Sequence, residues 1–350
     1  MKKKVEKSNP IIAYKGFNEN LCSRCFGFQY EVGKEYHLDN DDDINVCYNG
    51  FHACQNPMDV FVYYPMSSYT RYAMVMLWGD VDFAKDGKNI CATDIMIVKE
   101  IGIDEMVTVG IMASMPKIKI NENDETSHDR IISRKNDDSI YNPHNVGSVA
   151  SCGSNTSILS TGHWQKIASS GDWADIDAIG ECAEISTNGR RPIIKSNGIN
   201  HHISTSGYCS RIISHGDDVN VASGGMAEIY SDGKNATLYA SCMDSQIASI
   251  GDNANICISS IHGYVNSCGS DARIMSLEDK STIESTGEKA LVMSAGNYAR
   301  AKAKVGSWVV LTEYDTNYDI KCVKAEYVDG KRIKGDTLYM LVNGEFVKAI

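Results

Sequence analysis

Gly251-Asp-Asn-Ala-Asn-Ile-Cys-Ile-Ser259 is one copy of a nine-residue repeat whose consensus is G-D-x-A-x-I-x-S-x. Glycine opens such units at nine-residue steps from Gly153 to Gly216, and the steps resume at Gly224 after a unit that is one residue short. A fixed period of this kind is typical of solenoid proteins, in which each repeat forms one structural unit that stacks on its neighbours.

Within a unit, positions four, six and eight are apolar or small and alternate with polar or variable positions. This period of two is typical of a β-strand with one buried face. Ile recurs at position six, as in Ile176 and Ile256, whereas positions four and eight carry mostly Ala and Ser. Two units are needed to close a coil, so we expect about nine turns in a rod about 40 Å long. The small inward side chains require two closely spaced sheets.

The Gly-Asp pair at the start of a unit is expected to form the turn between strands. Gly tolerates positive φ, and the Asp side chain can accept a hydrogen bond from its own backbone segment. Calcium-binding nonapeptide rolls have a similar period, but they carry Asp at position six, where this sequence carries Ile. The outward positions hold no Thr ladder that would form a flat ice-binding face. The repeat therefore favours a rigid spacer or an interaction surface.

The expected fold class is mainly β, in four parts. A small α+β domain spans residues 1–112, a polar linker or loop spans 113–143, a parallel β-solenoid of about eighteen units with two per coil spans 144–311, and a β-hairpin cap spans 312–350. Within the first part, Asn56-Pro57 predicts a helix N-cap followed by Pro at the first helical position.

Composition restricts the possible partners. The net charge of −11 argues against binding of nucleic acid through a basic surface. No secretion signal and no stretch long enough to span a membrane is visible in the sequence. The twelve cysteines are scattered, and several fall at variable solenoid positions, which indicates reduced thiols. We therefore expect a cytoplasmic protein with neither nucleic acid nor a membrane as partner.

Several motifs of the first domain carry a resemblance. Tyr14-Lys-Gly-Phe, Phe28-Gln-Tyr-Glu and above all Gly50-Phe-His-Ala-Cys lie upstream of a closing strand that ends near Glu100. Together they resemble an uncharacterised domain family that is common in phages and gut-associated bacteria and often precedes octa- or nonapeptide repeats. The resemblance covers about the first 110 residues. It implies a phage- or mobile-element-encoded protein in a bacterial host, and it implies no established activity.

More remotely, the order of these elements resembles ADP-ribosyltransferase folds, in which a first-strand residue, a central polar strand and a late glutamate surround NAD. That resemblance would give catalytic roles to Tyr14, Lys15, His52 and Glu100, with NAD as cofactor. The usual Ser-Thr-Ser and Glu-x-Glu patterns are absent from the sequence. A structural interpretation stands beside it: His52 ties a strand to the following helix, and Glu100 ends a strand.

A zinc site is a weaker alternative. Cys22-Ser-Arg-Cys25 has the spacing with which two thiolates grip one ion, and Cys47 and Cys54 follow in the same domain. The second pair has irregular spacing, so reduced core cysteines are the simpler interpretation. No phosphate-binding loop, Ser-His-Asp order or metalloprotease helix is visible in the sequence. We therefore expect no cofactor and no enzymatic activity.

The outward positions of the solenoid include apolar residues that predict an interaction surface. They are Leu159, Ile193, Ile213, Tyr230, Tyr239, Met275 and Met293. From these we expect a scaffold or interaction protein that forms homo-oligomers, or docks a protein partner, through a solenoid face. An NAD-binding transferase domain targeted by the solenoid is one alternative. A phage anti-defence protein that binds a host factor or a nucleotide signal is another.

Overall fold

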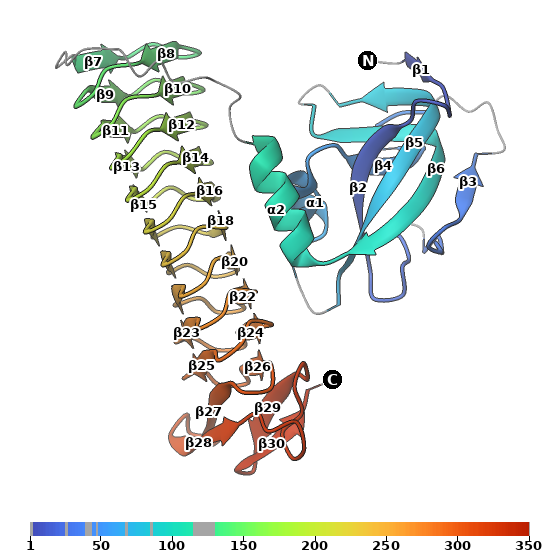
Figure 1. Cartoon of the computed structure of the whole chain (residues 1–350), viewed down its shortest axis with the longest axis vertical. Helices are drawn as coiled ribbons and strands as arrows, with labels where there is room; N and C mark the ends of the chain where they lie inside the picture. Colours follow the sequence, from blue (N-terminus) through green and yellow to red (C-terminus); the bar gives the residue numbers. More distant parts are fainter. Residues whose placement is uncertain are drawn as a thin grey trace. The chain divides into compact units, whose positions relative to one another are not determined.

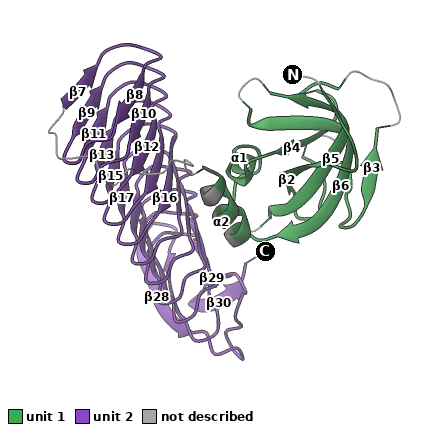
Figure 2. Ribbon diagram, turned by 45° about the horizontal axis from the view of Figure 1, so that its top comes forward, with its two compact units in different colours: residues 1–114 green, residues 115–350 purple. Residues whose placement is uncertain are grey.

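A computed structural model describes residues 3–24, 27–38, 44–46, 48–66, 69–84, 87–114 and 130–349 (Figure 1). The chain forms two compact units, residues 1–114 and residues 115–350 (Figure 2). The first is a small domain built mainly from β-strands, and the second is a parallel β-solenoid with an antiparallel end. This architecture confirms the fold class expected from the repeat.

The described residues of the first unit form six strands and two helices. They are β1 Lys3–Val5, β2 Ile11–Phe17, β3 Glu35–His37, β4 Phe51–Cys54, α1 Pro57–Tyr63, β5 Arg71–Phe83, β6 Asn89–Ile101 and α2 Ile103–Ser114. The strands pair in the order β1-β5-β2-β4-β6-β3, and an additional pairing joins β5 to β6. The four strands β2, β5, β6 and β4 therefore close into a ring. Two register shifts in the pairing of β5 with β6 let the long strand β5 bend around the ring.

The interior of this ring is apolar, with Ala13, Val75, Leu77 and Ile95 buried inside it. Helix α1 begins as the sequence predicts. The Asn56 side chain accepts a hydrogen bond from the backbone N–H of Met58 at 3.0 Å, which satisfies one of the unpaired donors at the helix N-terminus. None of the described helices is long and apolar enough to span a membrane.

Where the structure describes it, from residue 130 to 349, the second unit consists of two sheets of 12 strands each. We call them the odd sheet and the even sheet after their parallel strands. The odd sheet contains β7 Arg130–Ser133, β9 Ser148–Ser151, β11 Lys166–Ser169, β13 Glu184–Thr187, β15 His202–Thr205, β17 Asn220–Ser223, β19 Thr237–Ala240, β21 Asn255–Ile258, β23 Arg273–Ser276, β25 Leu291–Ser294, β27 Trp308–Tyr314 and β28 Ile320–Tyr327. The even sheet contains β8 Ser139–Asn142, β10 Ser157–Ser160, β12 Asp175–Ile179, β14 Ile193–Asn197, β16 Ser210–His215, β18 Ala227–Ser231, β20 Gln246–Ser249, β22 Tyr264–Ser267, β24 Thr282–Ser285, β26 Arg300–Lys302, β29 Tyr339–Val342 and β30 Glu345–Lys348.

The position-six side chains form the core between the two sheets. In the even sheet Ile158 pairs with Ile176, which pairs with Ile194, and all three are buried. The same order holds in the odd sheet, where Ile167 pairs with Ile185. Each coil thus contributes one bulky residue per sheet, with small residues on either side, and the sheets can lie close together as the sequence predicts.

Most turns differ from the expected ones. In most units the residue with positive φ is the third and is not glycine; such residues recur at nine-residue steps from Asp137 to Asp218 and from Asn235 to Tyr298. Among the unit-opening glycines, Gly180 and Gly216 also have positive φ. Their backbone N–H groups link neighbouring coils: that of Asn253, for example, donates to the Ser270 carbonyl at 2.9 Å. The left-handed conformation aims this N–H along the solenoid axis, so stacking determines the turn.

The first glycine of a unit has a different role from the one expected. A Cβ added to Gly251 would lie 1.8 Å from the carbonyl oxygen of Gly233 in the preceding coil. Glycine is therefore needed because the backbones of stacked coils approach closely. The unit expected to open at Gly224 begins one residue later, at Gly225, and it is this unit that is one residue short, because Gly233 opens the next. Gly225 stacks on Gly207 in this way, whereas a Cβ on Gly224 would have no neighbour nearer than 3.8 Å.

The N-terminal end of the solenoid extends beyond its predicted boundary. Strands β7 and β8 pair in parallel with β9 and β10, so the first described coil lies within the segment expected to be a linker. Its inward Ile131 and Ile140 continue the core, which explains why this polar stretch is ordered as strand. At the other end, β28 pairs antiparallel with β27, and the β29–β30 hairpin turns at Asn343-Gly344. These antiparallel strands form the predicted cap.

Candidate interaction face of the solenoid

Tyr14, Lys15 and His52 lie on neighbouring strands of the first unit. Lys15 is buried, its ammonium donates to the His52 carbonyl at 2.7 Å, and it lies 5.4 Å from the centre of the Tyr30 ring. Burial, and secondarily the Lys15 charge, lower the pKa of His52. Tyr14 alternates to the other face of β2, and burial raises the pKa of its hydroxyl. The structure thus brings Lys15 and His52 together through a backbone contact.

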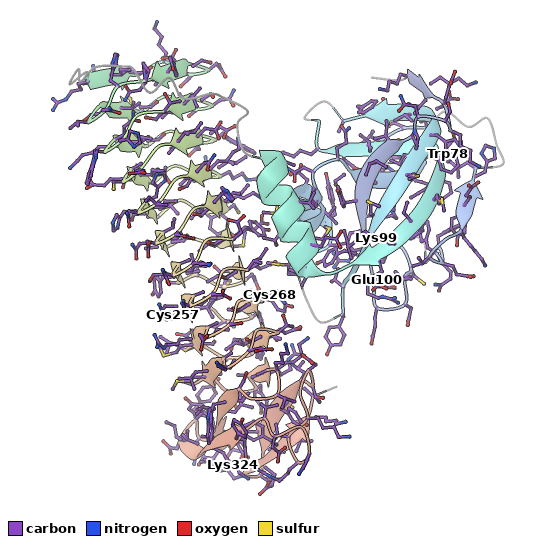
Figure 3. All side chains as sticks on the ribbon, viewed as in Figure 1. Trp78, Lys99, Glu100, Cys257, Cys268 and Lys324 are labelled. Carbon is purple, nitrogen blue, oxygen red and sulfur yellow. The ribbon has the colours of Figure 1, made fainter. Side chains whose placement is uncertain are left out.

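Glu100 lies near the end of β6 (Figure 3) and forms a two-pronged ion pair with Arg71 on β5. The Arg71 Nε donates to one carboxylate oxygen at 2.6 Å, and its Nη2 donates to the other. Hydrogen bonding to Arg71 lowers the pKa of Glu100, so this side chain is ionised at neutral pH. Glu100 therefore joins the ends of two strands, as the structural interpretation of the sequence expects.

Two of the four cysteines considered for zinc, Cys25 and Cys47, lie outside the described residues. The Cys22 thiol donates to the Gln29 side-chain oxygen at 2.9 Å, and Cys54 is buried at the end of β4. Among the residues that the structure describes, no group of three or more His, Cys, Asp or Glu side chains could hold a metal ion.

The seven apolar residues expected to form an interaction surface do not share one face. Four lie on the even sheet, where Leu159 and Ile193 are half-buried and Ile213 and Tyr230 are 2% and 0% exposed. Alternation predicts the direction of a side chain, but it does not predict whether the surface around that side chain remains open. The other three are exposed on the odd sheet.

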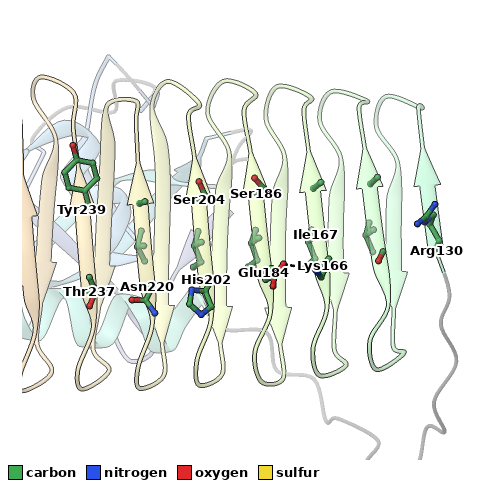
Figure 4. Close-up of a pocket in the computed structure, with 18 of the residues that line it drawn as sticks. Arg130, Lys166, Ile167, Glu184, Ser186, His202, Ser204, Asn220, Thr237 and Tyr239 are labelled. Atoms are coloured by element: carbon green, nitrogen blue, oxygen red, sulfur yellow. Dashed lines mark ion pairs between the residues drawn. The ribbon is translucent and has the colours of Figure 1, made fainter.

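A shallow groove runs along the outward surface of the odd sheet over its first six strands (Figure 4). Small residues at position seven of consecutive odd-sheet units form its floor: Ala150, Ala168, Ser186, Ser204 and Ala222. Ile132 lines one end, and the ring of Tyr239 closes the other. The small floor and the bulky end residues produce a trough whose length follows the solenoid.

A ridge follows the groove on the same face. From β19 onward, position seven carries larger apolar residues: Tyr239, Cys257, Met275, Met293 and Val310. Tyr239, Met275 and Met293 are 37%, 40% and 38% exposed. Monomeric proteins seldom expose a contiguous row of large apolar side chains, so this ridge is an interaction candidate.

The edge of this face is formed by the position-five side chains. They include Lys166 and Glu184, which form an ion pair at 3.2 Å (Figure 4). Further along the same row lie the exposed Arg273, Leu291 and Trp308. The row is thus polar and of mixed charge beside the groove, and it becomes partly apolar beside the ridge.

Comparison with known protein families finds a match within the first unit. Residues 11–109 match the family model described as a domain of unknown function, DUF7666. The expected resemblance to an uncharacterised domain family is thereby confirmed. No curated protein and no solved structure matches the chain. The DUF7666-like region ends close to the end of the first compact unit, so the solenoid lies outside the matched region.

The groove was not among the features predicted from the sequence, although a signal for it exists. Reading position seven only in alternate units gives five small residues followed by five larger ones. The prediction pooled outward positions from both sheets and therefore lost this order. Because side chains on one sheet are spaced by two units, only a reading at a step of eighteen residues recovers it.

Proposed function

We propose that this protein is a non-enzymatic scaffold that associates with protein through the outward face of its odd sheet. The observation that carries the proposal is the groove and ridge on this face, where Tyr239, Met275 and Met293 stay exposed. An apolar groove and ridge on a rigid sheet suit protein docking, because the sheet loses little conformational entropy when a partner binds.

The polar groups of the first unit support a structural role over a catalytic one. Glu100 engages Arg71 through both carboxylate oxygens, and the Lys15 ammonium contacts a backbone carbonyl. In the ADP-ribosyltransferase-like alternative, these two residues would instead contact NAD. The DUF7666-like domain carries no activity that could be transferred from its family, so the solenoid face remains the better-supported functional surface.

Affinity capture and a direct binding measurement, both with the full chain, test the scaffold function. We expect affinity capture with the purified protein to recover a protein that is lost when Ser186→Arg fills the groove and retained in Tyr141→Arg, which changes an exposed residue of the even sheet. The captured protein must then bind the purified chain directly, with the same dependence on Ser186. Binding that is equal in both variants would contradict docking on this face.

The enzymatic alternative has its own readout. NAD binding in calorimetry, or NAD-dependent labelling that disappears in Glu100→Gln, would replace the scaffold proposal with a transferase. We expect neither signal.

We further propose, from the sequence resemblance and the scattered thiols, that the protein is encoded by a phage or mobile element and acts in a bacterial cytoplasm. Alkylation of all twelve cysteines in denaturant without prior reduction would agree with that compartment, and cysteines that react only after reduction would contradict it.

A further inference from the structure

The groove and the ridge divide the odd sheet at its midpoint. The sheet has 12 strands, and the change from small to large position-seven residues falls between Ala222 on β17 and Tyr239 on β19, with six strands on each side. We propose that two copies of this chain pack face to face about a two-fold axis at this boundary, so that each ridge fills the groove of the other copy. This inference rests on the proposed scaffold function and names the partner.

The position-seven row is self-complementary under this symmetry. The axis runs along the strand direction, so the first strand faces the twelfth of the second copy, the second faces the eleventh, and so on. The resulting pairs match a small residue with a larger one: Ile132 with Ala325, Ala150 with Val310, Ala168 with Met293, Ser186 with Met275, Ser204 with Cys257 and Ala222 with Tyr239. Ridge-into-groove packing of this kind would cover the exposed methionines with the small residues of the groove.

The position-five row is also complementary. Glu184 on β13 faces Arg273 of the second copy, and Lys166 faces the apolar Leu291. Ser148 faces the large ring of Trp308, and the symmetry repeats each pair. No two like charges meet in this row among the described residues. Because an isologous interface presents one patch to itself, both rows must fit at once. The position-seven row is complementary in size, and the position-five row pairs Glu184 with Arg273 without bringing like charges together.

The size of the face suits a stable dimer. Twelve strands at the usual spacing, each contributing four residues, cover about 750 Å² per copy. Standard protein interfaces bury about 800 Å² per partner. A peptide lying in the groove alone would leave the ridge exposed, whereas a second copy covers both. A second copy is therefore the occupant that the surface fits best.

Sedimentation and light scattering of the full chain test the assembly. We expect a mass twice that of the 38.4 kDa chain. Ser186→Arg in the groove or Met275→Arg on the ridge should give a single-chain mass, while Tyr141→Arg on the even sheet should remain dimeric. Glu184→Arg and Arg273→Glu should each raise the dissociation constant at least about tenfold, because like charges then meet twice, and the double variant should restore it. Circular dichroism checks that each variant is folded.

A cross-link tests the register. Ser204→Cys would face the native Cys257 of the second copy, so a mild thiol oxidant should join two chains through these two sulfurs. Ala168→Cys, which faces Met293, should cross-link no more than the unchanged chain. A dimer that lacks the specific cross-link and ignores Ser186→Arg would overturn this arrangement. A monomeric chain that still captures another protein through Ser186 would overturn the dimer and leave the scaffold function intact.

Discussion

Asp172 accepts a hydrogen bond from the backbone N–H of Arg190, which lies 18 residues, or one coil, later in the sequence, at 2.8 Å. The Arg190 guanidinium also donates to the same carboxylate at 2.8 Å. The relationship recurs along the solenoid, with Asp252 accepting from the N–H of Ser270 at 2.8 Å. The Asp of the Gly-Asp pair therefore connects stacked coils. The sequence had instead suggested that this Asp would bond the backbone of its own turn.

Replacing Asp172 should separate these two contacts. We expect Asp172→Ala to lower the melting temperature, because the N–H of Arg190 loses its acceptor. Asp172→Asn should retain most of the stability, since Asn145 accepts the corresponding bond from the N–H of His163 at 2.8 Å. Thermal unfolding of both variants side by side measures the difference. Equal melting temperatures for the two would show that the inter-coil bond is unimportant.

Glycine at the start of a unit should be required only where coils touch. Gly251→Ala places a Cβ against the Gly233 carbonyl, which forces the backbones apart, and we expect a loss of about 1–3 kcal/mol in unfolding free energy. Gly224→Ala is the matched control, because its Cβ would meet only ordinary contacts. Chemical denaturation compares them. A similar loss at both sites would mean that backbone freedom, not close stacking, makes glycine necessary.

Replacing the left-handed third residue of a unit by glycine should increase the stability of the protein. Lys289 is exposed and has φ +56°, a conformation that costs most side chains energy. We expect Lys289→Gly to raise the unfolding free energy by up to about 1 kcal/mol. Lys234→Gly, at a second position without positive φ, should lower it. A loss of stability in Lys289→Gly would contradict strain at this position.

A column of buried serines runs along the interior of the even sheet. The Ser249 hydroxyl is buried without a hydrogen-bond partner among the described residues. The hydroxyls of Ser231 and Ser267, on the neighbouring strands, are likewise buried and unpaired among those residues. Since an unpaired buried hydroxyl is costly, Ser249→Ala should stabilise the protein by about 1 kcal/mol. In contrast, Ser276→Ala should destabilise it, because the Ser276 hydroxyl donates to that of Ser281 at 2.6 Å. Denaturant midpoints distinguish the two signs.

His201 should make the solenoid sensitive to acid. Its Nε2 donates to the Gly180 carbonyl at 2.8 Å, so its Nδ1 accepts from the Ser196 hydroxyl, and its burial lowers its pKa. The unfolded chain therefore binds a proton more readily, and stability should fall as pH drops below about 6.5. His201→Gln should reduce that fall, because Gln165 donates to a backbone carbonyl from the equivalent place. Melting curves at pH 5 and 7.5 test this, and an unchanged pH dependence would exclude His201 as the source.

The sequence by itself determined the elements that depend on short-range order. Alternation at position six fixed the inward Ile ladder, because neighbouring side chains on a strand must point to opposite faces. Asn56-Pro57 fixed the start of α1, and Asn343-Gly344 fixed the turn of the last hairpin, since these residues satisfy local backbone geometry.

The tertiary structure decided what depends on residues a full coil or more apart. Stacking determined that Gly225, rather than Gly224, lies against the backbone of the preceding coil. Pairing with β9 makes Arg130–Ser133 the first described strand of the solenoid. The groove and ridge arise from side chains eighteen residues apart, which become neighbours only when the coils stack.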